Sequence, residues 1–128
     1  MSEMSNYLEN ALINVTLRAT TYTAPTTVYV GLYTSDPTDA NTGTEVTGGS
    51  YVRKSATFGA PSNGVSTTSA DITFDQATAS WGTIGWIGIL DASTSGNLLY
   101  HTPLDTSKTI DTGDIFKIAA GSLTVTLA

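Results

Sequence analysis

After Pro25 the apolar residues of this chain recur with a period close to two, and this pattern constrains the fold more than any other feature of the sequence. In Thr27–Thr34, Val28, Val30 and Leu32 alternate with the remaining residues, as in a strand with two different faces. Comparable segments are Ser50–Phe58, Ala70–Asp75, Trp81–Leu90, Asn97–Thr102, Asp114–Ala119 and Ser122–Leu127, with a shorter candidate at Thr106–Ile110. Short strands without intervening helices cannot form a parallel sheet. The sequence therefore predicts an all-β fold, an antiparallel, jelly-roll-like β-sandwich of seven or eight strands.

One segment ahead of Pro25 has a helical period instead, from about Asn6 to Ala19. Ser5 or Asn6 can supply its N-cap, and Arg18 lies toward its C-terminal end, where a positive charge suits the helix dipole. Its apolar stripe consists of Met4, Tyr7, Leu8, Ala11, Leu12, Val15 and Ala19. The stripe predicts that the helix packs on the sandwich, whose core we expect to include Leu8, Leu12, Val15, Val28, Val30, Leu32, Ile87, Ile89, Leu123 and Val125.

Two further apolar residues, Ile13 and Leu17, lie on the opposite side of this helix. Two interpretations remain open for the pair. The side chains contact a partner, or they cover the Thr20–Pro25 connection of the same chain.

Length, charge and composition exclude several classes of protein. A chain of 128 residues is expected to form a single domain, residues 1–128. Its net charge of −6 argues against nucleic-acid binding, and the absence of cysteine removes disulfides, thiolate metal sites and cysteine nucleophiles. The longest apolar run, Ile84–Leu90, is too short to span a membrane. The 24 threonines and 13 serines predict a neutral, hydroxyl-rich surface.

No catalytic motif emerges from the sequence. His101 is the one candidate base, but a triad with a serine and Asp91 or Asp105 can be drawn by chance in so Ser- and Asp-rich a chain, and we expect its ring to face solvent or a neighbouring subunit. Acidic residues lie at turns, where they commonly bond their own backbone. Calcium remains an alternative at two such groups, Asp36, Asp39 and Glu45, or Asp111 and Asp114. The prediction is a protein that is not an enzyme and has no cofactor.

Two other places are candidate interfaces. Ser35–Gly49 is long, polar and without an apolar period, so we predict a mobile, partner-contacting loop that presents Asp36 and Asp39. Trp81 follows polar Ser80 at the start of a strand and is a candidate for an interface, whereas Trp86 is expected in the core. With Ile13 and Leu17, these residues make up the predicted interaction surface.

Four segments together carry a resemblance to a known family: Thr27–Asp39, Gly48–Gly64, Ile72–Ala92 and Gly96–Leu127. In order and content they resemble small virion proteins of tailed bacteriophages and prophages, and the similarity extends to the N-terminal helix. Members are labelled tail-fibre proteins, and small β-sandwich proteins of this kind also serve as capsid cement or decoration.

The resemblance implies a structural protein of the virion, made in the host cytoplasm. Because the chain is short and has no shaft repeat, the preferred interpretation is a capsid cement or decoration protein that binds the outer capsid lattice, as a homo-oligomer, through the major capsid protein or another virion protein. The alternative is a tail-fibre or receptor-binding component, with a host-surface glycan as ligand. A carbohydrate-binding module ranks below both.

Overall fold

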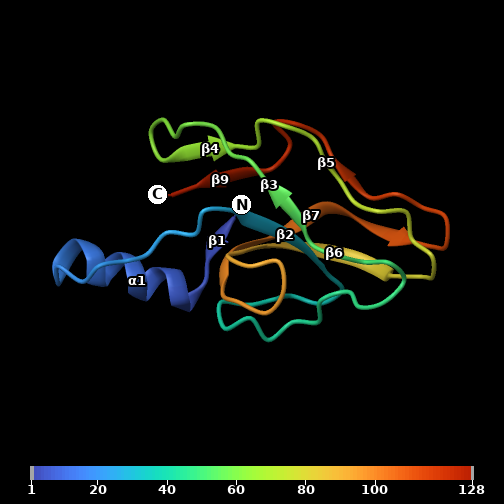
Figure 1. Ribbon diagram of the computed structural model, residues 1–128, viewed down its shortest axis with the longest axis horizontal. Coiled ribbons are helices and arrows are strands. Elements are labelled where there is room, and N and C mark those ends of the chain that lie inside the picture. The colour runs from blue at the N-terminus through green and yellow to red at the C-terminus, as the bar shows by residue number, and fades with distance from the viewer. Residues whose placement is uncertain (1, 128) are drawn as a thin grey trace.

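The computed structural model describes residues 2–127, and strands provide most of its regular structure (Figure 1). The elements are β1 (Glu3–Met4), α1 (Asn6–Leu17), β2 (Val28–Tyr33), β3 (Lys54–Ala56), β4 (Val65–Thr67), β5 (Ile72–Thr73), β6 (Gly82–Leu90), β7 (Leu98–Ile110), β8 (Lys117–Ile118) and β9 (Thr124–Thr126). All of the pairings between these strands are antiparallel. The predicted all-β, sandwich-like class with one N-terminal helix is confirmed.

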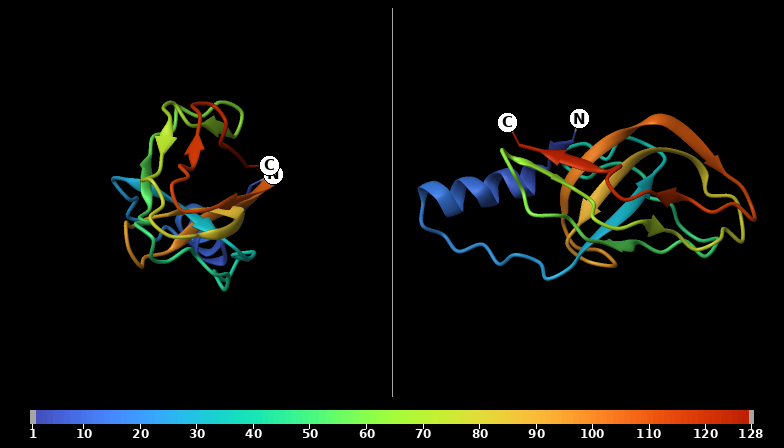
Figure 2. Two further views of the ribbon diagram at one scale, coloured as in Figure 1. Left: turned by 90° about the vertical axis from the view of Figure 1, so that its right-hand side faces the viewer. Right: turned by 90° about the horizontal axis from the view of Figure 1, so that it is seen from above.

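The strands form two layers. The larger layer is a five-stranded sheet in the order β1-β7-β6-β2-β3, and the ribbons β4–β9 and β5–β8 lie across it (Figures 1 and 2). The core lies between the layers, with Val30, Leu32 and Ile87 from the sheet packed in one cluster with Ile72 and Leu123 from the other side.

The opposite face of the sheet is covered by the segment that follows β2. Tyr33 is buried there and donates its hydroxyl hydrogen to Asn41 Oδ1 at 3.1 Å. Gly88 provides the space for its ring, because a Cβ at that position would lie 2.7 Å from Tyr33 Cε1 and 2.9 Å from Leu98 Cδ1. Strand β2 is therefore buried on both of its two different faces from Val30 onward.

Nine strands occur in residues 2–127, where the sequence predicts seven or eight. The additional strands are β1 and β4, which are two and three residues long and carry too few residues to show a period. The two segments predicted at Asn97–Thr102 and Thr106–Ile110 are one continuous strand, β7. Pro103 does not interrupt it, because it lies opposite Trp86 next to a register shift in the β6–β7 ladder, where a missing N–H is tolerated.

The helix begins and ends close to the predicted positions. Ser5 is the N-cap, and its Oγ accepts a hydrogen bond from Leu8 N at 3.2 Å. The helix ends two residues earlier than predicted because Arg18 is the C-cap and Ala19 has a φ of +54°. Glycine is the usual residue at such a left-handed position, so the sequence carries no signal for this end.

Candidate functional site

The most distinctive surface of the molecule is α1, which projects from the sandwich (Figure 1). Its first turn is held at the sheet, since Ser5 N donates to Leu99 O at 2.9 Å and the buried Ser5 hydroxyl donates to Leu98 O. Among the strands, α1 contacts mainly β7, and Leu8 is the one residue of α1 that is fully buried. The rest of α1 and the connection back to β2 form an arm, residues 9–27, that extends beyond the sheet (Figure 2).

The arm exposes aliphatic side chains on both sides of the helix. Ile13 is 53% exposed and Leu17 79% exposed, so their own chain leaves most of the surface of these residues uncovered. Val15 is 40% exposed, which makes its predicted place in the core wrong. Leu12 is half-buried and is not part of the core cluster either, because the helix axis leaves the body after its first turn.

The predicted loop at 35–49 is folded onto the sheet instead of being a free polar segment. Thr44 N donates to Ser35 Oγ at 2.8 Å, Thr38 N donates to Asp36 Oδ1 at 2.9 Å, and Val46 is part of the core cluster. The Asp39 carbonyl also accepts a hydrogen bond from Asn6 N at 2.9 Å, which links the segment to the start of α1. The expectation of a mobile loop is not supported by these bonds.

Asp36 and Asp39 lie beside the single histidine of the chain. His101 Nε2 is 2.8 Å from Asp39 Oδ1 and 3.8 Å from Glu3 Oε2, and His101 Nδ1 is 4.0 Å from Asp36 Oδ1. The expectation that the His101 ring faces solvent is wrong, because its side chain is only 4% exposed. Strand β1, which the sequence did not predict, brings Glu3 opposite His101 in the β1–β7 register.

Neither partner proposed for a His101 triad contacts the ring. Asp91 accepts hydrogen bonds from Asn97 N and Nδ2, at 2.7 and 3.0 Å, and so closes the β6–β7 hairpin. The carboxylates found at His101 instead come from segments 62 and 98 residues away in sequence, for which no spacing motif exists.

In both groups that the sequence left open for calcium, acidic side chains bind protein atoms. Glu45 forms a bidentate ion pair with Arg53, with both N–O distances 2.8 Å, and its carboxylate does not group with those of Asp36 and Asp39. Asp114 Oδ2 accepts a hydrogen bond from Asp111 N at 2.8 Å, so that pair has the structural role of a turn.

The Glu45–Arg53 pair is the centre of a partly buried network. Tyr51 donates its hydroxyl hydrogen to Glu45 Oε2 at 2.6 Å and accepts one from Leu32 N at 2.9 Å. Burial, and then the adjacent Glu45 carboxylate, raise the pKa of Tyr51. Burial raises the pKa of Tyr33 to about 12. The sequence alone gives no sign of this network.

Trp81 is not at a surface, so its prediction as an interface residue is wrong. Its side chain is 4% exposed, and Nε1 donates to Gly49 O at 2.9 Å. The ring packs edge-on against Tyr51, with centroids 5.5 Å apart, and against Phe74 at 6.5 Å. These rings fill the core and are not available as a platform for a sugar.

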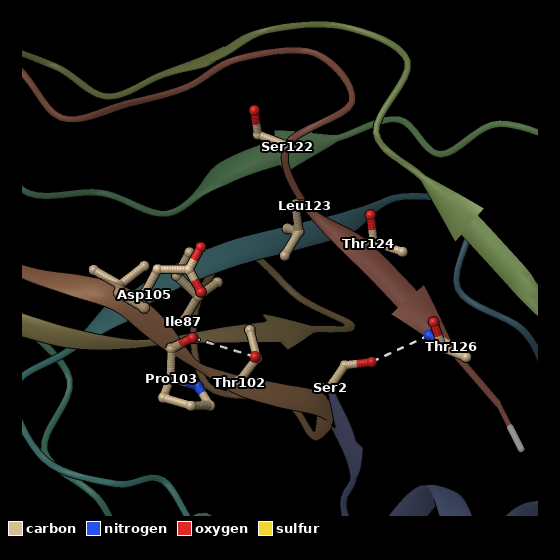
Figure 3. A pocket seen from close by; sticks show the side chains of 10 residues that line it. Ser2, Ile87, Thr102, Pro103, Asp105, Ser122, Leu123, Thr124 and Thr126 are labelled. Atoms are coloured by element: carbon tan, nitrogen blue, oxygen red, sulfur yellow. Dashed lines mark hydrogen bonds between the residues drawn. The ribbon is translucent and has the colours of Figure 1, made fainter.

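A groove runs between β7 and β9, with a volume of about 470 Å³ (Figure 3). Hydroxyl side chains and Asp105 line it together with apolar Ile87 and Leu123, and Ser2 Oγ accepts a hydrogen bond from Thr126 N at 3.2 Å at one end. None of its lining residues is aromatic. The groove offers hydrogen bonds to a ligand but no ring on which a sugar could stack.

These features define a class of small, sandwich-like β proteins with one N-terminal helix that projects from the body and exposes aliphatic side chains. Residues 3–126 match the family model of the podophage GP4 fiber I protein gp80, and the chain belongs to this family. It is therefore a phage structural protein, as the resemblance implied. No curated protein matches the chain. No helix among residues 2–127 is long and apolar enough to cross a membrane.

Proposed function

We propose that this protein is a non-enzymatic subunit of a phage fibre and that α1 joins it to further copies of itself. The family name supports the fibre over the capsid cement role, which the sequence had ranked first. The observation that carries the assembly role is the exposure of Ile13 and Leu17 on an arm that its own chain leaves uncovered.

The arm gains little stability from its own chain. A helix of 12 residues is about 18 Å long and is marginal in water unless an apolar face is buried against something else. Fully burying an exposed aliphatic side chain adds about 1.5 to 3 kcal/mol, and the half-exposed Ile13 and Val15 would each add a fraction of this. Covering Ile13, Val15 and Leu17 would therefore stabilise both the helix and the assembly.

The pattern of α1 fits other copies of the same helix. Leu12 and Val15, three residues apart on one side of the helix, can form a seam with another copy, whereas Leu8, one turn before them, is buried within its own chain. Ile13 and Leu17 lie outside this seam, so a helix with neighbours on two sides, as in a bundle of three or more, would bury both groups. The chain has a net charge of −6, but Glu9 and Arg18 balance each other along the arm, so copies repel least there.

The surroundings of His101 support a structural role. Its ring is buried and lies beside the carboxylates of Glu3 and Asp39, which come from two other parts of the chain. The contacts of His101 in β7 therefore connect this strand to β1 and to the 35–49 segment.

The self-assembly of the arm can be tested with the double variant Ile13→Ser, Leu17→Ser. A matched control, Asn10→Ser with Thr16→Ser, places two serines at exposed positions of the same helix. Sedimentation over a range of protein concentrations should show an oligomer for the wild type and the control, and a monomer with an unchanged strand signal in circular dichroism for the double variant. A wild type that remains monomeric, or a double variant that sediments like the wild type, would refute self-assembly through α1.

The place in the virion is tested separately. Gold-labelled antibodies against the folded chain should bind the fibres in electron micrographs of intact particles. Labelling spread over the capsid would refute the fibre assignment and restore the cement interpretation.

A further inference from the structure

The cluster around His101 has the composition of a metal site. Three residues each offer one ligand atom: Glu3 in β1, Asp39 in the 35–49 segment and His101 in β7. These three atoms lie within 4.8 Å of one another. The imidazole is buried, while the side chains of Glu3 and Asp39 are 67% and 49% exposed. An ion can therefore reach the two carboxylates from solvent, while the histidine ligand is covered by protein.

Among residues 2–127, no lysine or arginine pairs with the carboxylates of this cluster. His101 Nε2 carries at most one proton, so it can donate to Asp39 or to Glu3 but not to both. Asp36 adds a third carboxylate on the Nδ1 side of the ring. A divalent cation would supply the missing positive charge.

The backbone fixes the three ligands independently. Glu3 is held opposite His101 by the β1–β7 pairing, and the Asp39 carbonyl accepts the hydrogen bond from Asn6 N. Ligand atoms on bonds of about 2.0 to 2.2 Å in a tetrahedral site are about 3.3 to 3.6 Å apart. The distances from His101 Nε2 to Asp39 Oδ1, 2.8 Å, and to Glu3 Oε2, 3.8 Å, bracket this range, so side-chain rotations alone can admit the ion.

We propose that Glu3, Asp39 and His101 bind a divalent first-row transition cation of the Zn²⁺ type, with water completing its coordination. An imidazole ligand selects this class over Ca²⁺ and Mg²⁺, which prefer oxygen alone. The site lies at the N-terminal end of α1. Glu3 is two residues before the Ser5 N-cap, and the carbonyl of Asp39 accepts the hydrogen bond from Asn6 N. A bound cation would link the N-terminal end of α1 to β7 and to the 35–49 segment.

The experiment uses the 128-residue chain without a tag, so that His101 is the one histidine in the sample. A chelator first removes any bound metal. Titration calorimetry with Zn²⁺ should give one ion per chain, and the ring resonances of His101 should shift in nuclear magnetic resonance spectra as the ion binds. Ca²⁺ and Mg²⁺ at the same concentrations should leave these resonances in place. The melting temperature should rise with Zn²⁺.

Three variants separate this site from adventitious binding. Glu3→Gln and Asp39→Asn each remove one ligand oxygen's charge and should weaken Zn²⁺ binding at least tenfold, whereas Glu9→Gln removes an equal charge from the exposed face of α1 and should bind as the wild type does. The proposal is overturned if the wild type shows no saturable binding, if the His101 resonances do not move, or if the two ligand variants bind as tightly as Glu9→Gln.

Discussion

Replacing Arg53 by methionine measures how much the buried charge network contributes to stability. The guanidinium donates two hydrogen bonds to Glu45 and two more, from Nη1, to Ala92 O at 2.9 Å and Ser95 O at 2.8 Å. The Arg53 side chain is 9% exposed and that of Glu45 is 21% exposed. The substitution leaves Glu45 partly buried without its counter-charge and deprives two carbonyls of their donor.

The expected loss follows from the burial of the pair. Removing one partner of a buried ion pair costs about 3 to 5 kcal/mol, and the partial exposure of Glu45 places this case near 3 kcal/mol. That is a large share of the roughly 5 to 15 kcal/mol that stabilises a domain. The melting temperature should fall by about 10 °C.

Lys54→Met is the matched control, because the adjacent Lys54 forms an ion pair with Asp75 at the same N–O distance of 2.8 Å. The side chains of that pair are 29% and 53% exposed, so its loss should cost less than about 1 kcal/mol. Urea unfolding followed by tryptophan fluorescence gives both free energies. Equal losses in the two variants, or a loss below about 1 kcal/mol for Arg53→Met, would refute the argument that burial decides the contribution.

Three further substitutions or titrations test other parts of the structure. Gly88→Ala should destabilise the fold by about 1 to 3 kcal/mol in urea unfolding, because its methyl group would collide with the ring of Tyr33, whereas Gly85→Ala, with no atom within 4 Å of the added Cβ, should leave stability nearly unchanged. The raised pKa values of Tyr33 and Tyr51 mean that the folded state holds these two protons more tightly than the unfolded state does. The stability that the two tyrosines contribute is therefore present below pH 10 and is lost as the pH rises toward about 12. Tyrosinate absorbance should show both groups ionising together with alkaline unfolding, and ionisation of either group in folded protein would contradict this. Ser5→Ala should cost about 1 to 2 kcal/mol and reduce the helical signal in circular dichroism, since it removes the N-cap of α1; an unchanged helical signal would show that the cap is not needed.

How much the sequence predicts depends on the range of the interaction involved. The alternation in Val28–Tyr33 and Gly82–Leu90 predicts two central strands within a residue or two of their ends, because the period of a strand is a local property. The Ser5 cap and the start of α1 follow from local chemistry in the same way. Spacing alone also places Ile13 and Leu17 opposite the stripe, and both side chains are exposed.

By itself, then, the sequence determined the all-β class, one helix at the N-terminus and the absence of cysteine chemistry. The tertiary structure alone decided which faces are covered: Val15 is exposed because α1 leaves the sheet after one turn, and Trp81 is buried because Gly49 and Tyr51 close over it. It alone brought Glu3 and Asp39 to His101 and Glu45 to Arg53. The physical reason is that charge pairing and burial depend on distances in space between residues far apart in the chain, and no local period or spacing encodes those distances.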